Sequence, residues 1–288
     1  MKYVTLKDLA TTIRKNIYKI PHDVDFVISI PRSGTIVGSI ISEFLNVPLI
    51  DIDSYMNGSE PTGGNRVKCI HKIKTNKVLV IDDTTYSGDS MNAAKEKLKE
   101  DSHEFIFGVA YLEGYEGEKH IDFYLEDVRH FTKNFPIVLY EWNIFHHYPQ
   151  TLMKTMFDMD GVFCLDPPDE RNTEAYEQYI KNAIPLFTPT MPIGKIVTYR
   201  LVKYNEETTN WLAKNNITYG HLIMFNAQSY EERSNSNISP EIMKGSLYKD
   251  DTDSLLFIES NDYQARQIHK ISGKPVLSVE QNILYGGE

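Results

Sequence analysis

Short hydrophobic runs alternate with amphipathic stretches along the first half of the chain. The runs that have the character of buried strands are residues 24–30, 47–52, 77–81 and 105–111, with shorter pieces at 120–125 and 136–140. Apolar residues with helical spacing at 35–45 and 91–100 fall between these runs. This repetition of strand and helix predicts an α/β domain with a mainly parallel sheet, in which ligands bind at the carboxyl ends of the strands.

The same alternation starts again after residue 155. Strand-like runs cover residues 156–162, 195–199, 221–225, 254–259 and 274–279, and helical patterns cover about 170–183, 206–216 and 261–272. Residues 141–156 fit a helix or a connector. We therefore predict two Rossmann-like α/β domains with mainly parallel sheets, at residues 1–150 and 151–288.

Composition and charge narrow the classes of partner. The chain has 288 residues, of which 41% are hydrophobic and 24% charged, and its formal net charge is −10. An acidic chain is poorly suited to a nucleic-acid backbone, so we expect no nucleic-acid partner. The two cysteines lack the spacing of a zinc site or a disulfide framework. No signal peptide and no run of about 20 apolar residues is present, which predicts a cytoplasmic protein without a membrane span.

The segment VLVIDDTTYSGDSM (78–91) carries the first chemical signature. A hydrophobic run leads to the adjacent acids Asp82 and Asp83, and a predicted helix begins after the loop. The residues of this loop are Thr84, Thr85, Tyr86, Ser87, Gly88, Asp89 and Ser90. Amide groups at a helix start, helped by hydroxyl groups, can hold a phosphate dianion. Paired carboxylates can accept hydrogen bonds from a ribose diol or approach a hydrated Mg²⁺ ion.

A second loop, PRSG at 31–34, follows the first strand-like run. Arg32 supplies a forked donor for a pyrophosphate oxygen, while Ser33 and Gly34 leave backbone amides accessible. Residues 54–68 then form a Gly-rich segment that includes Arg66. Such a segment fits a lid that closes over bound pyrophosphate and excludes water.

These two loops, in this order, resemble the signature of type I phosphoribosyltransferases, which bind 5-phosphoribosyl-1-pyrophosphate (PRPP). The resemblance implies that residues 82–90 hold the ribose 5-phosphate, and that Arg32 and Arg66 neutralise the departing pyrophosphate together with Mg²⁺. Displacement at ribose C1 passes through an oxocarbenium-like state, so the protein must orient the nucleophile. Enzymes of this type are often dimers, and the resemblance therefore implies a homodimer, although no interface can be read from the sequence.

The second half opens on a hydrophobic run that ends in Asp-Met-Asp-Gly at residues 158–161. This pattern resembles the first motif of the haloacid dehalogenase superfamily, in which an aspartate attacks phosphorus. The resemblance implies that Asp158 is the nucleophile and that Asp160 protonates the leaving group. It also implies that both carboxylates help to hold Mg²⁺.

Three later residues match further motifs of that superfamily in order: Thr198, Lys244 and Glu259. By the resemblance, Thr198 binds phosphate, Lys244 neutralises the nucleophile and the phosphate, and Glu259 is a metal ligand. Lys244 is preferred to Lys249 because its spacing from the last strands and the tyrosine that follows fit the superfamily better. Nearby residues whose roles stay open are Arg200, Lys249 and Asp262.

The inserts between these motifs are short. About 37 residues separate Asp160 from Thr198, and about 45 separate Thr198 from Lys244. Neither stretch is long enough for a full cap domain once its predicted helices and strands are subtracted. We therefore predict a fold with a minimal cap or none, which would leave the nucleophile open to a bulky substrate.

The two motif sets in tandem resemble bifunctional proteins of bacterial surface-polysaccharide synthesis. The resemblance implies transfer of ribosyl 5-phosphate from PRPP to a hydroxyl of a glycan or lipid-linked glycan. Removal of the 5-phosphate would then leave a ribofuranosyl residue. Two alternatives stay open: a nucleobase phosphoribosyltransferase fused to a nucleotidase, and a PRPP-sensing regulator with an attached phosphatase. The sequence does not indicate which acceptor hydroxyl or anomer is used.

Overall fold

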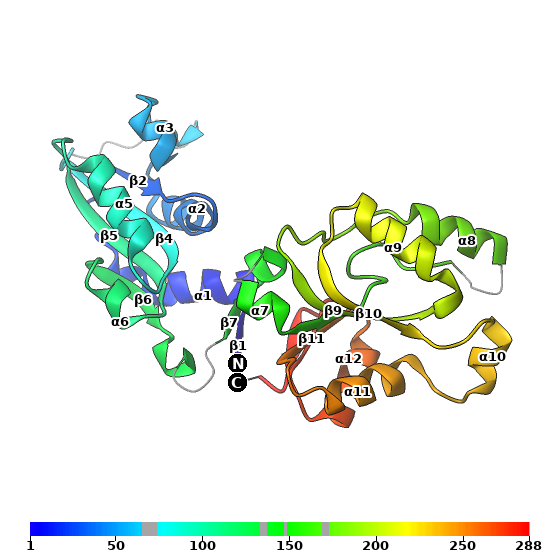
Figure 1. Ribbon diagram of the computed structural model, residues 1–288. Helices are drawn as coiled ribbons and strands as arrows, with labels where there is room; N and C mark the ends of the chain where they lie inside the picture. The colour runs from blue at the N-terminus through cyan, green and yellow to red at the C-terminus, as the bar shows by residue number, and fades with distance from the viewer. Residues whose placement is uncertain (65–73, 133–136, 147–148, 169–172, 288) are drawn as a thin grey trace. The chain divides into compact units, whose positions relative to one another are not determined.

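The computed structural model describes residues 1–64, 74–132, 137–146, 149–168 and 173–287 (Figure 1). The chain divides into two compact units. The N-terminal unit is Val4–Val138, and the C-terminal unit is Leu139–Glu288 together with Met1–Tyr3. None of the helices in the described ranges has the length and apolar character that a membrane span requires.

The N-terminal unit is built on a five-stranded sheet with the order β3-β2-β4-β5-β6, and every neighbouring pair is parallel. Its strands are β2 (Phe26–Ser29), β3 (Leu49–Asp51), β4 (Lys77–Thr85), β5 (Glu104–Leu112) and β6 (Phe123–Asp127). Its helices are α1 (Leu6–Asn16), α2 (Ser33–Leu45), α3 (Ile52–Met56), α5 (Asp89–Leu98) and α6 (Tyr115–Glu118), with 3₁₀ turns η1 (Ile17–Lys19) and η2 (Arg129–Thr132). The predicted parallel α/β sheet is confirmed.

Both faces of this sheet are covered, which explains why its strands read as continuous hydrophobic runs. On β4, Val78 and Val80 belong to one buried cluster, which also includes Met91 and Leu98 from α5. Leu79, between them in sequence, points to the opposite face and is also buried, because side chains alternate along a strand. The sheet therefore holds the carboxyl end of β4 firmly, and the loop that follows β4 starts from a fixed position.

The C-terminal unit contains a six-stranded sheet with the order β10-β9-β8-β11-β12-β13. Its strands are β8 (Thr155–Phe157), β9 (Ile193–Leu201), β10 (Tyr219–Phe225), β11 (Leu256–Glu259), β12 (Val276–Ser278) and β13 (Ile283–Tyr285). All neighbouring pairs are parallel except β12 with β13. In addition, β1 (Lys2–Val4) pairs with β7 (Val138–Tyr140) in a two-stranded sheet.

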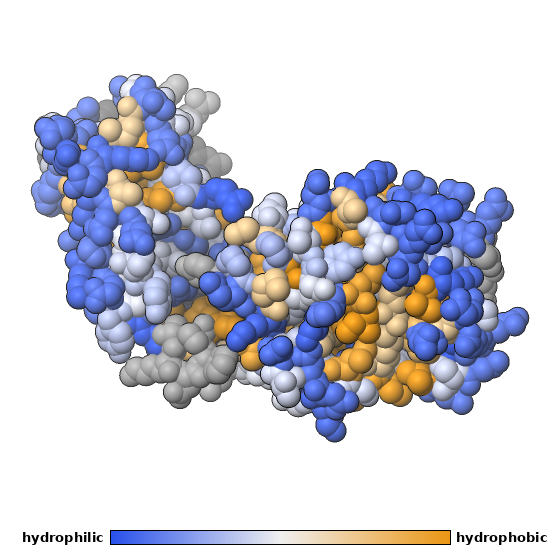
Figure 2. All heavy atoms as spheres, in the orientation of Figure 1, coloured by the Kyte–Doolittle hydropathy of each residue, from blue (hydrophilic) through white to orange (hydrophobic). Residues whose placement is uncertain are grey.

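Helices lie on both faces of the larger sheet. They are α7 (Pro149–Met153), α8 (Thr173–Asn182), α9 (Asn205–Lys214), α10 (Tyr230–Asn235), α11 (Pro240–Asp250) and α12 (Asp262–Ser272), with 3₁₀ turns η3 (Glu141–His146) and η4 (Val202–Tyr204). Figure 1 shows α8 and α9 on one side of the sheet, and α11 and α12 on the other. Hydrophilic residues cover much of the face shown in Figure 2, as expected when apolar side chains pack against the sheets.

The neighbouring parallel strands β8 and β11 of this unit end at the same edge of the sheet. Asp158 directly follows β8, and Glu259 ends the neighbouring β11. The two strand ends are joined by a hydrogen bond from the Asp158 N–H to the Ile258 carbonyl oxygen at 2.8 Å. Because parallel strands bring their carboxyl ends to the same edge, acids that lie far apart in the sequence meet there.

Candidate functional site

The acidic pair at the end of β4 is buried. Asp82 and Asp83 are 8% and 7% exposed, and the Asp83 backbone N–H donates to Asp82 Oδ1 at 2.9 Å. Burial, followed by the charge of Asp83, raises the pKa of Asp82 to about 8. Two crowded carboxyl groups of this kind would be stabilised by a cation or by the hydroxyl donors of a sugar.

The loop after the acidic pair leads into α5. Gly88, at the N-cap of this helix, has a φ of 87°, a conformation that favours glycine. The Ser87 hydroxyl donates to Asp89 Oδ2 at 2.8 Å, and both side chains are exposed. The Glu113 N–H donates to the Thr85 carbonyl oxygen at 2.9 Å and ties the loop to the end of β5. The start of α5 therefore follows the acidic pair after a short loop that is tied to β5, and its amides are groups that could hold a phosphate.

The PRSG loop packs directly against this acidic pair. A Cβ placed on Gly34 would lie 2.8 Å from Asp82 Oδ1 and 3.0 Å from the Ile81 carbonyl oxygen. Only glycine permits so close an approach, so the structure brings the two predicted loops together at one edge. Arg32 is exposed, and the Pro31–Arg32 peptide bond is cis. Arg66, the other predicted pyrophosphate ligand, lies outside the described residues, as do the flanking positions 65–73.

The C-terminal unit has a polar cavity of about 600 Å³ at the common edge of its central strands. The cavity is lined by Asp158, Asp160, Gly161, Asp166, Pro167, Tyr199, Arg200, Pro240, Lys244, Ser260, Asn261, Gln264, Val279 and Glu280. Its walls come from the loop after β8, from β9, and from the starts of α11 and α12. The sequence prediction did not include Asp166, Ser260, Gln264 or Glu280; their only signal is that they follow β8, β11 or β12 in the chain.

Lys244 connects two of the predicted acids. Its Nζ lies 2.9 Å from Asp158 Oδ2 and 2.8 Å from Glu259 Oε2, and all three side chains are buried. Burial and then the charge of Glu259 raise the pKa of Asp158 well above its usual range. Burial alone would lower the pKa of Lys244, but the two carboxylates raise it, so the ammonium stays charged. Lys249, the competing lysine, is exposed and does not line the cavity.

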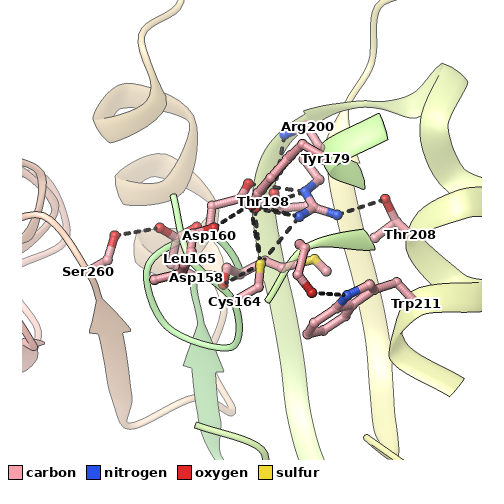
Figure 3. Close-up of polar contacts among 12 residues, drawn as sticks. Asp158, Asp160, Cys164, Leu165, Tyr179, Thr198, Arg200, Thr208, Trp211 and Ser260 are labelled. Atoms are coloured by element: carbon pink, nitrogen blue, oxygen red, sulfur yellow. Dashed lines mark hydrogen bonds and ion pairs between the residues drawn. The ribbon is translucent and has the colours of Figure 1, made fainter. Parts of the chain in front are cut away.

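Asp160 is held by Arg200 (Figure 3). Arg200 Nε lies 3.0 and 3.1 Å from the two carboxylate oxygens of Asp160, and Nη2 lies 2.5 Å from Oδ1. The Tyr179 hydroxyl also donates to Asp160 Oδ1 at 2.6 Å. Although burial would raise the pKa of Asp160, the guanidinium lowers it. The sequence assigned no role to Arg200; its signal was its position two residues after Thr198, on the same face of β9.

Two further predicted residues have clear positions. Thr198 is fully buried, and its Oγ1 accepts a hydrogen bond from the Arg200 N–H at 3.2 Å. Asp262 binds the Tyr285 hydroxyl at 2.6 Å and Arg266 Nη2 at 2.7 Å, and it does not line the cavity. The structure therefore gives Asp262 a structural role beside β13.

The donor chemistry of the cavity fits a divalent cation. Four acids and two cations line it: Asp158, Asp160, Asp166 and Glu280, with Lys244 and Arg200. A fifth acid, Glu259, pairs with Lys244. Carboxylate oxygens are the ligands that Mg²⁺ prefers. As the side chains stand, no three His, Cys, Asp or Glu residues of the described ranges are gathered closely enough to hold a metal ion. Lys244 lies between Asp158 and Glu259, and Arg200 holds Asp160.

Comparisons with known proteins bear on the N-terminal unit. Residues 3–143 match the family described as phosphoribosyl transferase domain. A comparison with curated proteins finds no match. Among solved structures, the chain is similar to xanthine-guanine-hypoxanthine phosphoribosyltransferase of Helicobacter pylori, with 15% identity and a TM-score of 0.35 over 50% of this chain and 92% of that one. It is also similar to purine phosphoribosyltransferase of Pyrococcus horikoshii, with 19% identity and a TM-score of 0.34 over 49% and 94%.

A third similar structure is orotate phosphoribosyltransferase of Aeropyrum pernix, with 14% identity and a TM-score of 0.33 over 43% of this chain and 71% of that one. Because these scores are low, the assignment depends on the family match. The family match supports phosphoribosyl transfer from PRPP. The similarity to the phosphoribosyl transferase domain family thus extends over residues 3–143 of this chain.

Proposed function

We propose that this chain transfers ribosyl 5-phosphate from PRPP to a glycan hydroxyl and then removes the 5-phosphate. In the first step the acceptor oxygen bonds to ribose C1, pyrophosphate leaves, and the hydroxyl proton is released. In the second step water converts the phosphomonoester to a neutral ribofuranosyl residue and inorganic phosphate. The observation that carries the second step is the buried cluster of Asp158, Lys244 and Glu259 at a polar cavity.

The transfer step is assigned to the N-terminal unit. The amides at the start of α5 and the hydroxyls of the preceding loop would hold the 5-phosphate, while Asp82 and Asp83 would accept hydrogen bonds from the ribose diol. Gly34 brings the PRSG loop against Asp82, so pyrophosphate and ribose would be bound side by side. Mg²⁺ bound with pyrophosphate would neutralise the charge that develops on this leaving group.

Phosphate removal is assigned to the C-terminal unit, which we propose to have a haloacid dehalogenase-like fold. Asp158 Oδ would attack phosphorus, and the buried Lys244 would stabilise both the attacking carboxylate and the phosphoryl oxygens. Asp158, Asp160 and Glu259 would hold Mg²⁺, which supplies further charge neutralisation at the phosphate. Thr198, which is fully buried beside Arg200, would support the phosphate-binding edge of β9.

A large acceptor fits the limited cover over this cavity. Between Asp160 and β9, the described residues form a loop at 161–168 and the helix α8. That segment is too short for a separate cap domain, so the cavity can be reached by a phosphate at the end of a glycan. This supports a glycan over a small metabolite as the proposed substrate.

The acceptor class can be tested directly. The protein would be incubated with PRPP and Mg²⁺ in the presence of free sugars or oligosaccharides, nucleobases, or no acceptor, and release of pyrophosphate and phosphate would be followed. The proposal predicts pyrophosphate release with sugar acceptors, followed by phosphate. Release only with nucleobases would support a nucleobase transferase fused to a nucleotidase, and PRPP binding without turnover would support a PRPP-sensing regulator.

A reciprocal pair of variants tests the division of labour. Asp158→Asn should reduce phosphate release by at least about 10³-fold because the nucleophile is lost, while pyrophosphate release continues and the phosphorylated product accumulates. Asp83→Asn should reduce pyrophosphate release and leave hydrolysis of an added phosphosugar unchanged. Mass spectrometry of the products checks both variants. Loss of both activities in either variant would contradict two independent sites.

A further inference from the structure

The ammonium group of Lys244 has a third partner besides the two acids. Its Nζ lies 2.9 Å from Asp158 Oδ2 and 2.8 Å from Glu259 Oε2, and it also donates to Gln264 Oε1 at 3.1 Å. A lysine ammonium has three N–H donors and no acceptor. The three partners therefore match the three donors, and the side-chain amide of Gln264 is the neutral one among them.

The contact with Lys244 determines the orientation of the Gln264 amide. Because an ammonium group can only donate, the amide atom that faces it must be the carbonyl oxygen Oε1. The other arm of the amide is the donor Nε2. Gln264 lines the cavity, and Nε2 has no hydrogen-bond partner within the part of the chain that the structure describes. This N–H₂ group is therefore a donor for a molecule that enters the cavity.

Close packing of α11 against α12 brings Lys244 and Gln264 together. Lys244 lies on α11 and Gln264 on α12. A Cβ on Gly245 would lie 2.9 Å from Ile271 Cβ, so glycine beside Lys244 lets the two helices approach. The Gln264 N–H donates to Asn261 Oδ1 at 3.0 Å, which caps the start of α12. The amide is thus carried by a capped helix turn rather than by a free loop.

The second cation of the cavity is engaged as well. Arg200 Nε and Nη2 contact Asp160, and Nη1 donates to Thr208 Oγ1 at 3.4 Å. A phosphomonoester dianion offers only acceptor oxygens, so it needs N–H or O–H donors in addition to nearby positive charge. An amide at position 264 supplies such a donor and still gives Lys244 an acceptor. A glutamate there would add a third carboxylate and repel the phosphate.

We propose that Gln264 binds the phosphoryl group in the C-terminal cavity: its Oε1 holds Lys244, and its Nε2 donates to a non-bridging phosphoryl oxygen. This assignment rests on the proposed phosphatase function. No bond to Gln264 forms or breaks and no proton moves there, so its contribution is to binding. Because inorganic phosphate has the same oxygens as the phosphoryl group of the substrate, Gln264 contributes to the affinity for both.

The test measures binding of inorganic phosphate, which needs no turnover. Calorimetry on the full chain with saturating Mg²⁺ gives its Kd. Gln264→Met, which removes both the donor and the acceptor, should raise this Kd by about tenfold, as expected for the loss of one hydrogen bond to a charged group. Gln264→Glu keeps an acceptor for Lys244 but replaces the donor by a carboxylate, and should raise the Kd by about 10²-fold. The KM for ribose 5-phosphate should rise in the same order.

Gln267→Glu is the matched control, because it makes the same substitution on α12 at a residue that does not line the cavity. Its Kd for phosphate should stay within about twofold of that of the unmodified protein. Circular dichroism checks that each variant is folded.

An unchanged Kd in Gln264→Met would overturn the assignment even if Gln264→Glu bound more weakly, because repulsion alone would explain the weaker binding. An equal rise in Gln267→Glu would overturn it too. If the unmodified protein neither bound inorganic phosphate nor released it from ribose 5-phosphate, the phosphatase function itself would be rejected.

Discussion

The two units place acids at the same kind of position but compensate their charge differently. In the N-terminal unit, Asp82 and Asp83 lie near the carboxyl end of the central parallel strand β4, and their crowding is relieved by a proton, since the pKa of Asp82 is raised to about 8. In the C-terminal unit, the buried cations Lys244 and Arg200 pair with the acids at the ends of β8 and β11, although burial and Glu259 still raise the pKa of Asp158. The N-terminal pair therefore depends on a proton or a ligand for charge compensation, whereas the C-terminal cluster already contains two cations of the protein, Lys244 and Arg200.

This difference predicts different responses to substitution. Where the protein supplies its own cation, removing that cation leaves a buried charge and should destabilise the unit. Where a ligand is expected to supply it, neutralising one acid should stabilise the ligand-free protein and impair binding. Stability and function should thus change together in the C-terminal unit and in opposite directions in the N-terminal unit.

The largest effect is expected for Arg200→Met. Loss of the guanidinium leaves Asp160 buried without its main partner, and the free energy of unfolding should fall by about 3–5 kcal/mol. The two tryptophans of the chain, Trp142 and Trp211, both belong to the C-terminal unit, so fluorescence during urea unfolding reports on that unit. Adding Asp160→Asn to the variant should recover part of the loss, because the unpaired charge is then removed. A double variant no more stable than Arg200→Met would argue that the ion pair is not the cause.

The sequence predicted the positions of the acids better than it predicted their partners. Asp82, Asp83, Asp158 and Glu259 each follow or end a hydrophobic run, and a parallel sheet brings such ends to one edge. Which cation pairs with each acid depends instead on side chains that are distant in the sequence. Arg200 meets Asp160 because β9 lies beside β8, and no local pattern specifies this contact.

Several elements were missed for a related reason. The helix α11 has its apolar residues spread around its circumference, so the sequence around Lys244 did not indicate a helix. The antiparallel strand β13 is short and partly exposed, and its pairing with β12 is set by the tertiary fold. Long segments such as α2 and β4 were predicted because their buried residues follow a regular pattern of apolar positions in the local sequence.

An intermediate effect is expected for Gly34→Ala. The added methyl group would lie 2.8 Å from Asp82 Oδ1 and 3.0 Å from backbone, so the PRSG loop must move away from the acidic pair. Displacing a substrate-positioning loop should reduce PRPP-dependent pyrophosphate release by about 10²-fold. Hydrolysis of an added phosphosugar by the other unit should not change. Ser39→Ala, which changes an exposed position of the same helix α2, is the control; an equal loss there would show that the close approach is unimportant.

The smallest effect, and the one that separates the two sites most clearly, is expected for Asp82→Asn. Because the folded-state pKa of Asp82 is about 8 and its usual value is 3.8, folding takes up a proton between these values. The stability of the unmodified N-terminal unit should therefore fall as pH rises from about 4 to about 8, and asparagine should remove this dependence. The variant should be more stable by about 1–3 kcal/mol at pH 8 and no more stable near pH 4. Hydrogen exchange of β4 peptides measures this difference within the unit.

The same proton provides a binding test. If a cation that binds with the ligand compensates the charge of the acidic pair in place of the proton, the pair then ionises fully. Binding of Mg²⁺–PRPP at pH 7 should therefore release a proton from the unmodified protein. Calorimetry in buffers of different ionisation enthalpy measures that release. Asp82→Asn should bind more weakly and release less, whereas Asp53→Asn, which neutralises an exposed acid of the same unit, should behave like the unmodified protein. Equal proton release from all three proteins would mean that Asp82 does not hold the proton. The charge of the N-terminal acidic pair would then be compensated by other residues of the protein, as in the C-terminal cluster.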